Sequence, residues 1–131
     1  MKLNNINNQT IFPSEEKLTI DQVKTIIKDY FKITDQDLDL KTRARDIVEK
    51  RQIAHYFAKC YTTRSLATIG RMIGNKDHAT VLHSCKVVSN YYETDPEFRK
   101  NIIRIDAIFK SYQQNDSIEP NAINFVSIPQ Y

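Results

Sequence analysis

Apolar residues recur every three or four positions through most of this 131-residue sequence, and this spacing restricts the fold more than any other feature. A repeat of that length places the apolar side chains along one side of an α-helix. The pattern predicts main helices at about residues 20–33, 46–61, 66–73, 78–92 and 95–112. One further helical turn is expected near residue 35. We therefore predict an all-α protein, folded as a small helical bundle.

The same periodicity divides the chain into three parts. Residues 1–18 have weak periodicity, which predicts an irregular N-terminal lead-in. Residues 19–112 hold all the helical stripes and are predicted to form one domain, which suits a chain of 131 residues. Residues 113–131 are polar, contain Pro120 and Pro129, and are predicted to be a C-terminal tail.

Polar residues that cap helices stand at the expected boundaries. Thr19–Gln22 and Thr94–Glu97 have the pattern of a capping box, in which the first and fourth residues satisfy each other's backbone N–H groups. Ser65 and Asp77 are predicted N-caps of the helices that follow them. Between those two helices, Gly74-Asn75 is predicted to adopt the left-handed backbone of a tight helix exit.

Composition excludes several classes of protein. Gly70 and Gly74 are the only glycines, and they form neither a phosphate-binding P-loop nor a dinucleotide-binding fingerprint. No run approaches 18 consecutive apolar residues, and the polar first ten residues do not resemble a signal peptide. Cys60 and Cys85 are therefore expected to be reduced thiols, in a cytoplasmic protein without membrane association.

No arrangement of residues predicts a catalytic or metal site. His78 and His83 are five residues apart on one helix, about 140° around its axis, which does not suit shared zinc coordination. Cys85 belongs to an apolar stripe, where a nucleophile would be buried. Neighbouring carboxylates occur only in predicted loops. We expect a protein that is not an enzyme and that needs no metal or cofactor.

The positive charge is concentrated in one segment. The formal net charge is +3, but residues 41–86 contain ten Lys and Arg against three Asp and Glu. The rest of the chain holds nine basic and thirteen acidic residues, and such a basic block within a mildly acidic remainder is typical of a protein that binds a polyanion. A solvated basic face with no partner is the alternative, and charge alone does not separate the two.

Residues 65–90 have the pattern of a helix-turn-helix: a short capped helix, a turn with glycine, and a second amphipathic helix. The predicted core face of the second helix carries Val81, Cys85, Val88 and Tyr92. Its predicted solvent face carries Ala79, His83, Lys86 and Asn90. At its start, residues 77–80 combine polar side chains with free backbone N–H groups, which suit a phosphate or a base edge.

The sequences Ser65–Arg71 and Gly74–Lys86 resemble the signature of the C-terminal DNA-binding domain of the bacterial replication initiator DnaA. Lys50–Lys59 resembles the helix that precedes that signature, and Thr19–Ile33 resembles the first helix of the domain. The resemblance implies a helix-turn-helix fold of the DnaA C-terminal, Trp-repressor-like kind. It also implies that this domain stands alone here, without the ATPase module of an initiator.

The resemblance assigns roles to particular residues. Arg43, with Arg45 beside it, would enter a minor groove; Asp77 and His78 would read bases in the adjacent major groove. Phosphates would be held by Thr80, His83, Lys59 and Arg51. The complete set of expected DNA-binding residues is Arg43, Arg45, Arg51, Gln52, Lys59, Leu66, Lys76, Asp77, His78, Ala79, Thr80, His83 and Lys86.

Departures from the family pattern bear on the exact target sequence. Ala79 and Ala67 stand where the family usually has threonine and proline, and Thr42 and Ala44 make the connector less charged. The expected function is sequence-specific binding of double-stranded DNA, as a monomer, at sites like the DnaA box. This function would fit a factor that assists replication or regulates transcription. Such a factor would act in the nucleoid, would belong to a phage or mobile element, and would have a protein partner. The alternative is a protein-interaction module whose helix-turn-helix no longer reads DNA.

Overall fold

The computed structural model of the chain describes residues 18–114, and all regular structure in that range is helical. The helices are α1 (Ile20–Phe31), α2 (Asp35–Asp39), α3 (Arg45–Tyr61), α4 (Leu66–Met72), α5 (His78–Thr94) and α6 (Pro96–Gln114). The all-α prediction is therefore confirmed. The predicted lead-in and tail lie outside the described residues, except for three residues that belong to the packed domain. Leu18 is buried and donates its N–H to the Tyr61 carbonyl at 2.8 Å, while Gln113 and Gln114 end α6.

The predicted caps are largely confirmed. Thr19 and Gln22 form the complete capping box of α1, and Ser65 accepts a hydrogen bond from the Thr68 N–H at the start of α4. The box predicted at Thr94 is wrong, because Thr94 is the last residue of α5. Asp95 caps α6 instead, and its Oδ1 accepts from the N–H groups of the second and third residues of that helix.

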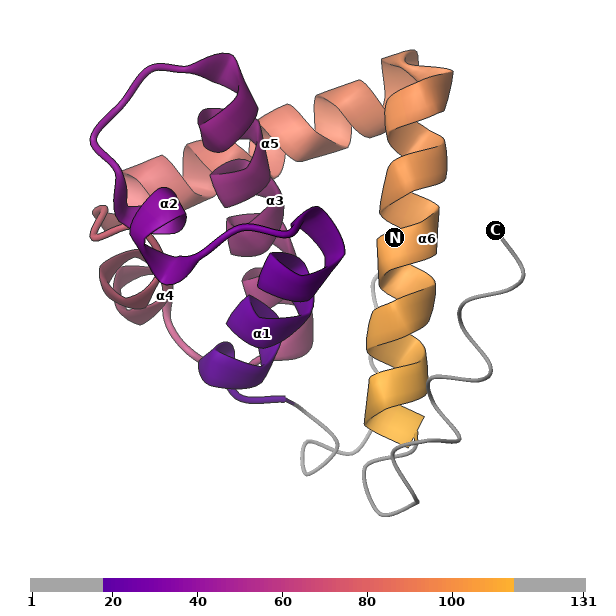
Figure 1. Cartoon of the computed structure of the whole chain (residues 1–131), viewed down its shortest axis with the longest axis horizontal. Coiled ribbons are helices and arrows are strands. Elements are labelled where there is room, and N and C mark those ends of the chain that lie inside the picture. The colour runs from indigo at the N-terminus through magenta and orange to yellow at the C-terminus, as the bar shows by residue number, and fades with distance from the viewer. Residues whose placement is uncertain (1–17, 115–131) are drawn as a thin grey trace.

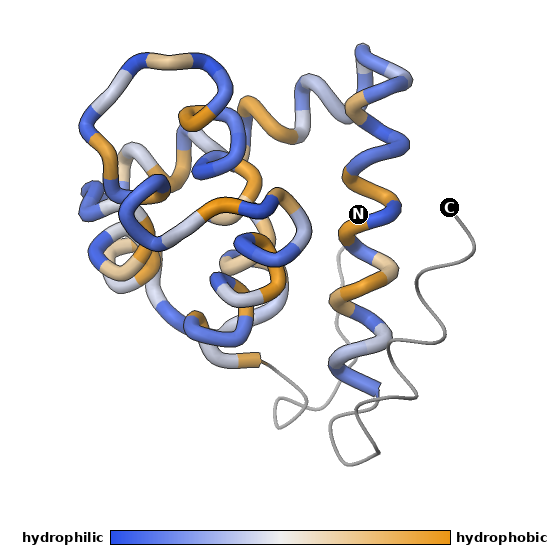
Figure 2. The backbone as a smooth tube through the Cα atoms, viewed as in Figure 1, coloured by the Kyte–Doolittle hydropathy of each residue, from blue (hydrophilic) through white to orange (hydrophobic). Residues whose placement is uncertain are grey.

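Helix α3 is the centre of the bundle and packs against α1, α2, α4 and α5 (Figure 1). Helix α6 turns away from the end of α5 and runs back beside α1. Figure 2 shows apolar and polar residues alternating along these helices, as expected for elements with one face turned to a core.

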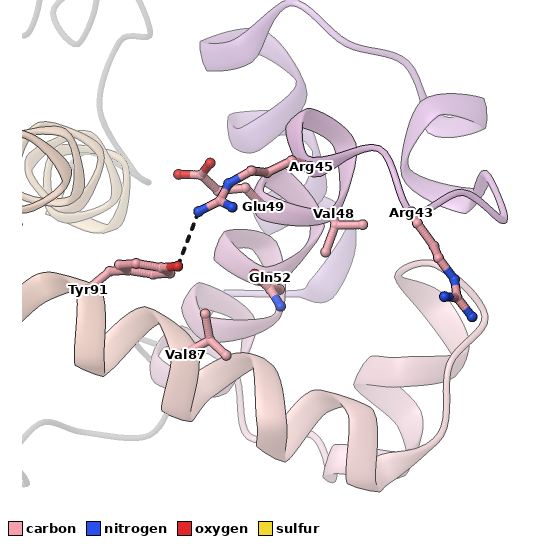
Figure 3. Close-up of a pocket in the computed structure, with 7 residues that line it drawn as sticks. All are labelled: Arg43, Arg45, Val48, Glu49, Gln52, Val87 and Tyr91. Carbon is pink, nitrogen blue, oxygen red and sulfur yellow. Dashed lines mark hydrogen bonds between the residues drawn. The ribbon is translucent and has the colours of Figure 1, made fainter.

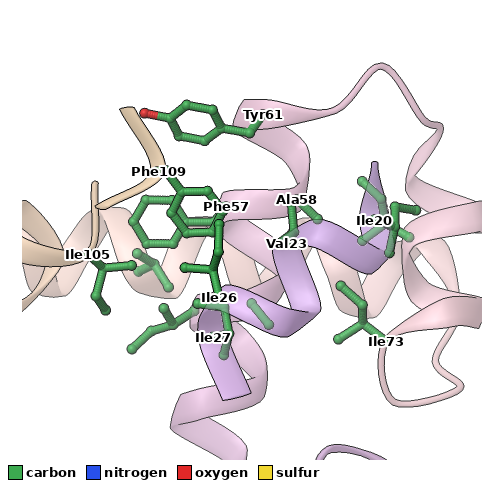
Figure 4. Close-up of a cluster of buried hydrophobic side chains, with 14 of the residues drawn as sticks. Ile20, Val23, Ile26, Ile27, Phe57, Ala58, Tyr61, Ile73, Ile105 and Phe109 are labelled. Carbon is green, nitrogen blue, oxygen red and sulfur yellow. The ribbon is translucent and has the colours of Figure 1, made fainter. Parts of the chain in front are cut away.

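Stacked aromatic rings join α3 to α6 in the core (Figure 4). The ring of Phe109 lies 4.7 Å from that of Phe57 and 5.0 Å from that of Tyr61, centroid to centroid. The Tyr61 hydroxyl donates to Asp106 at 2.6 Å, so the polar end of this ring is satisfied. Each buried ring contributes about 1.5–3 kcal/mol of stability. The cluster fixes α3, which in turn carries the connector and supports α5.

The predicted core face of α5 is right at its first three residues and wrong at the fourth. Val81 and Val88 are buried, and Cys85 is half-buried. Tyr92 is exposed, because the end of α5 extends past α3 toward α6. Its ring lies instead beneath the Arg99 guanidinium, 5.7 Å from the ring centroid.

Candidate nucleic-acid interface

The turn between α4 and α5 has the backbone geometry expected of a helix-turn-helix. Gly74 and Asn75 both have positive φ, +86° and +53°, which glycine and asparagine adopt at little cost. Gly70 lies directly under the turn, and the N–H of Lys76 donates to its carbonyl at 2.8 Å. A Cβ atom at Gly70 would overlap the Lys76 carbonyl. The close approach of α4 to the start of α5 therefore depends on glycine at this position.

Asp77 is the N-cap of α5, as predicted, and its side chain is exposed. Oδ1 accepts from the Thr80 N–H at 2.9 Å, and this bond lowers the pKa of the carboxyl. The group is therefore ionised at neutral pH. A carboxylate has two acceptor oxygens, so capping leaves one of them to accept from a donor outside the protein.

The solvent face of α5 carries the polar side chains that the sequence placed there. His78, Ala79, His83 and Lys86 are exposed, and Thr80 is half-buried. No large side chain on this part of the helix blocks a close approach, except Leu82, which is 43% exposed. The face is therefore mostly polar, and Lys86 adds a positive charge to it.

In front of the α5 N-terminus lies a surface pocket of about 430 Å³, which we call the turn pocket. Its lining residues are Ala67, Arg71, Asn75, Lys76, Asp77 and His78. Sequence reasoning missed Arg71, whose exposed side chain adds a second cation beside Lys76. The available signal was its place in the basic segment, on the helix that precedes the turn.

A second group of candidate residues lies on the connector between α2 and α3 and at the start of α3. Arg43 is exposed, and the connector has one internal hydrogen bond, from the Ala44 N–H to the Thr42 hydroxyl at 3.0 Å. Arg45 is the first residue of α3, and its Nη2 donates to the Tyr91 hydroxyl of α5 at 3.2 Å (Figure 3).

Between α3 and α5 lies a pocket of about 340 Å³, which we call the α3–α5 pocket (Figure 3). Its lining residues are Arg43, Arg45, Val48, Glu49, Gln52, Val87 and Tyr91. The structure thus brings three expected residues together at one surface. Tyr91 was not among the expected residues, because its position relative to Arg45 depends on how α3 and α5 pack.

The buried position of Arg51 does not suit the phosphate contact that the resemblance assigns to it. Its side chain is only 6% exposed, and Nη1 donates to the carbonyls of Leu38 at 3.0 Å and Leu40 at 3.1 Å. The stem of Arg51 also fills the space beside Gly74, whose N–H donates to Asp39. Arg51 therefore ties α2 and the connector to α3 and the turn, and we do not propose it as a phosphate contact.

His55 makes a second buried polar link. It is fully buried, with Nε2 2.8 Å from the Ile73 carbonyl and Nδ1 2.8 Å from the Ser84 hydroxyl. A carbonyl can only accept, so Nε2 carries the proton and Nδ1 accepts from Ser84. Burial lowers the pKa of His55 to about 4, so the ring is neutral at physiological pH. Neutral His55 joins α3 to the end of α4 and to α5.

The remaining expected residues are more scattered. Lys59 is exposed near the end of α3 and lines neither pocket. Leu66 is half-buried and packs against the core at the first residue of α4. Within residues 18–114, no three His, Cys, Asp or Glu side chains gather as metal ligands. No helix in this range is long and apolar enough to span a membrane.

Comparison with known proteins gives a family match and a set of similar sequences. Residues 20–93 match the family described as the bacterial DnaA protein helix-turn-helix. The chromosomal replication initiator protein DnaA of Flavobacterium psychrophilum is 48% identical over 86 residues, which are 66% of this chain and 18% of that protein. DnaA of Bacteroides thetaiotaomicron is 42% identical over 93 residues, covering 71% of this chain and 20% of that protein. This chain therefore spans about a fifth of the length of the relatives that it matches.

Proposed function

The chain belongs to the bacterial DnaA protein helix-turn-helix family, which implies DNA binding, and we propose that it reads a specific double-stranded DNA sequence. In this proposal α5 enters the major groove, with base contacts from Asp77, His78 and Ala79. Arg43 enters the adjacent minor groove, where a narrow A·T-rich groove attracts arginine by its negative potential. The matched region is a DNA-binding unit rather than a catalytic one.

The observation that supports the proposal most is that Asp77 presents an exposed, ionised carboxylate at the start of α5. An exposed carboxylate near DNA phosphates would weaken binding unless it accepts a hydrogen bond from a base. Its cap bond to Thr80 uses Oδ1 and fixes the side chain, so Oδ2 is held at the tip of α5. A cytosine amino group in the major groove is a suitable donor for that oxygen.

Phosphate contacts would fix the protein on the duplex. Thr80, His83 and Lys86 follow the solvent face of α5, and Lys59 and Lys76 add positive charge on neighbouring elements. Leu66, at the start of α4, would pack close to the DNA backbone. These contacts set position and orientation without reading sequence.

The proposed setting follows from the same features. One helix-turn-helix and one connector make an asymmetric interface, which suits a monomer on a DnaA-box-like site. We propose a replication-accessory or regulatory role in the nucleoid, with a replication or regulatory protein as a further partner. A chromosome, a phage or a mobile element could each use such a factor.

The first experiment measures fluorescence anisotropy with a duplex carrying a DnaA box and with a scrambled duplex, each at two salt concentrations. We expect the box to bind at least ~10³-fold more tightly. Equal affinity with a steep salt dependence would contradict sequence reading. No binding to either duplex would contradict DNA binding and favour the protein-interaction alternative.

Asp77→Asn tests whether the Asp77 carboxylate reads a base, because asparagine caps a helix about as well as aspartate. The outward group then changes from a pure acceptor to one that can donate. We expect preference at the contacted base pair to fall by ~1–3 kcal/mol with unchanged thermal stability. Asp95→Asn, at the N-cap of α6, is the matched control and should leave DNA affinity unchanged. An unaltered base preference in Asp77→Asn would contradict base reading by this residue.

A further inference from the structure

The proposed function has a geometric consequence for the surface between α5 and the connector. A major groove and the minor groove next to it are separated by one phosphodiester strand. If α5 occupies the first groove and Arg43 the second, that strand must cross the protein surface between them. This inference therefore rests on the proposed binding mode and extends it to the surface between α3 and α5, where Tyr91 and Glu49 have no assigned role.

The surface at that place is the α3–α5 pocket, which runs from Arg43 to Val87 and Tyr91 of α5 (Figure 3). Val48 and Val87 supply apolar surface for a sugar, and Gln52 supplies an amide donor. Arg43 and Arg45 outnumber the single lining carboxylate, Glu49, so the pocket has a positive balance. Its chemistry suits an anion with an apolar neighbour, as in a sugar-phosphate chain.

Tyr91 is prepared to donate a hydrogen bond into this pocket. Its hydroxyl oxygen already accepts from Arg45 Nη2 at 3.2 Å, which leaves the phenolic hydrogen for an outside acceptor. The ring is held from the other side by Phe98, with centroids 5.5 Å apart. The pair Arg45 and Tyr91 therefore presents two donors in a fixed arrangement to one acceptor.

We propose that the α3–α5 pocket binds the phosphodiester strand that separates the two grooves, with Tyr91 as a phosphate-contacting residue. Arg45, the first residue of α3, donates to the same phosphate. Glu49 opposes the contact through its negative charge, and so reduces the affinity of this site. The occupant is the DNA backbone itself, so the contact adds affinity and register without reading bases.

The test compares Tyr91→Phe with Tyr92→Phe on the box duplex. Tyr91→Phe removes only the hydroxyl, and we expect affinity to fall ~3- to 10-fold, the net size of one typical hydrogen bond. Tyr92 is equally exposed and outside the pocket, so Tyr92→Phe should bind like the wild type. Equal affinity of Tyr91→Phe and the wild type would overturn the proposal.

Glu49→Gln should change DNA affinity in the opposite direction. Removing the carboxylate should raise affinity ~2- to 5-fold and steepen the salt dependence of binding, because the phosphate is then less opposed. Glu93→Gln, on the exposed end of α5 outside the pocket, is the matched control. No gain in affinity in Glu49→Gln would also overturn the proposal.

A duplex with a neutral methylphosphonate at the phosphate between the two grooves locates the contact. On that duplex the loss caused by Tyr91→Phe should disappear, and a persistent loss would show that the hydroxyl acts elsewhere. These outcomes separate two failures. A wild-type protein that ignores the box duplex refutes the proposed function, whereas a specific binder indifferent to both variants refutes only the role of this pocket.

Discussion

The helix-turn-helix and the connector at residues 40–44 would meet adjacent grooves of DNA, but they are held in place by different means. The turn is fixed from within by the close approach at Gly70 and by positive φ at Gly74 and Asn75. The connector has one internal hydrogen bond, and its position depends on the bonds that Arg51 makes to Leu38 and Leu40. The helix-turn-helix thus has its own shape, whereas the connector takes its position from α3.

The largest expected effect on stability comes from a substitution that disrupts the helix-turn-helix. In an ordinary helix, Gly→Ala stabilises by about 0.5–1 kcal/mol. At Gly70 the added methyl would meet the carbonyls of Lys76 and Asp77, which are backbone groups. We expect Gly70→Ala to cost about 3 kcal/mol in urea unfolding and to abolish specific DNA binding. A stabilised variant would show that the turn does not depend on this approach.

The second effect concerns the buried link from α3 to the helix-turn-helix. The pKa of His55 is lowered from 6.5 to about 4 in the folded state, so below pH 6.5 the unfolded chain binds the proton more readily. Stability from neutral His55 is complete above pH 6.5 and is lost as pH falls toward 4. The expected loss between pH 7 and 4.5 is about 2.5 kcal/mol.

The check is the free energy of unfolding across that range in the wild type and in His55→Gln. The variant should be less stable at pH 7 and should show a flatter pH dependence. His78→Gln removes an exposed histidine and should keep the wild-type slope. If both variants keep that slope, the link through His55 carries no pH dependence.

The third effect addresses the connector. Arg51→Met keeps most of the buried stem but removes the donors to Leu38 and Leu40, so we expect a loss of about 2 kcal/mol in stability. Arg64→Met removes an exposed arginine and should have little effect on stability. The sharper measurement is a double-mutant cycle on the box duplex with Arg43→Ala. Because Arg51 acts through the position of Arg43, the two losses of affinity should not add, and strict additivity would contradict this coupling.

The smallest effect on stability belongs to Arg43 itself. Its side chain is exposed and makes no described contact that holds the fold, so Arg43→Ala should change the free energy of unfolding by less than ~0.5 kcal/mol. Affinity for the box duplex should nevertheless fall, and the salt slope should decrease by about one. Lys100→Ala removes a charge on α6, far along the chain from Arg43, and should change neither the affinity nor the salt slope. A large loss of stability in Arg43→Ala would show that Arg43 helps to hold the connector in place, which contradicts the proposed difference between the two regions.

The helices could be predicted from the sequence because their signals are local. A capping residue such as Asp77 acts on the next three residues, and an apolar stripe is visible within one helix. The position of Arg51 could not be predicted, because its acceptors belong to another helix and to the connector. On periodicity it is one more basic residue beside Gln52.

The candidate interface shows the same limit. The exposed face of α5 follows from helical spacing, and the predicted exposure of His83 and Lys86 is confirmed. The pairing of Arg45 with Tyr91 links residues 46 positions apart, so it depends on how α3 crosses α5. The roles of these residues on DNA remain predictions that the variants above test.

The junction between α5 and α6 restricts how sequences of this domain can vary in length. Asp95 is the single residue between α5 and α6: its N–H donates to the Tyr91 carbonyl at 2.8 Å, and its carboxylate caps α6. One inserted residue continuing the helix would turn α6 by about 100° and shift it by about 1.5 Å. That rotation would carry Phe109 away from Phe57, so we expect insertions and deletions at this junction to destabilise the fold. The connector between α2 and α3 has no helical register to keep, so a longer loop there would cost the fold itself little.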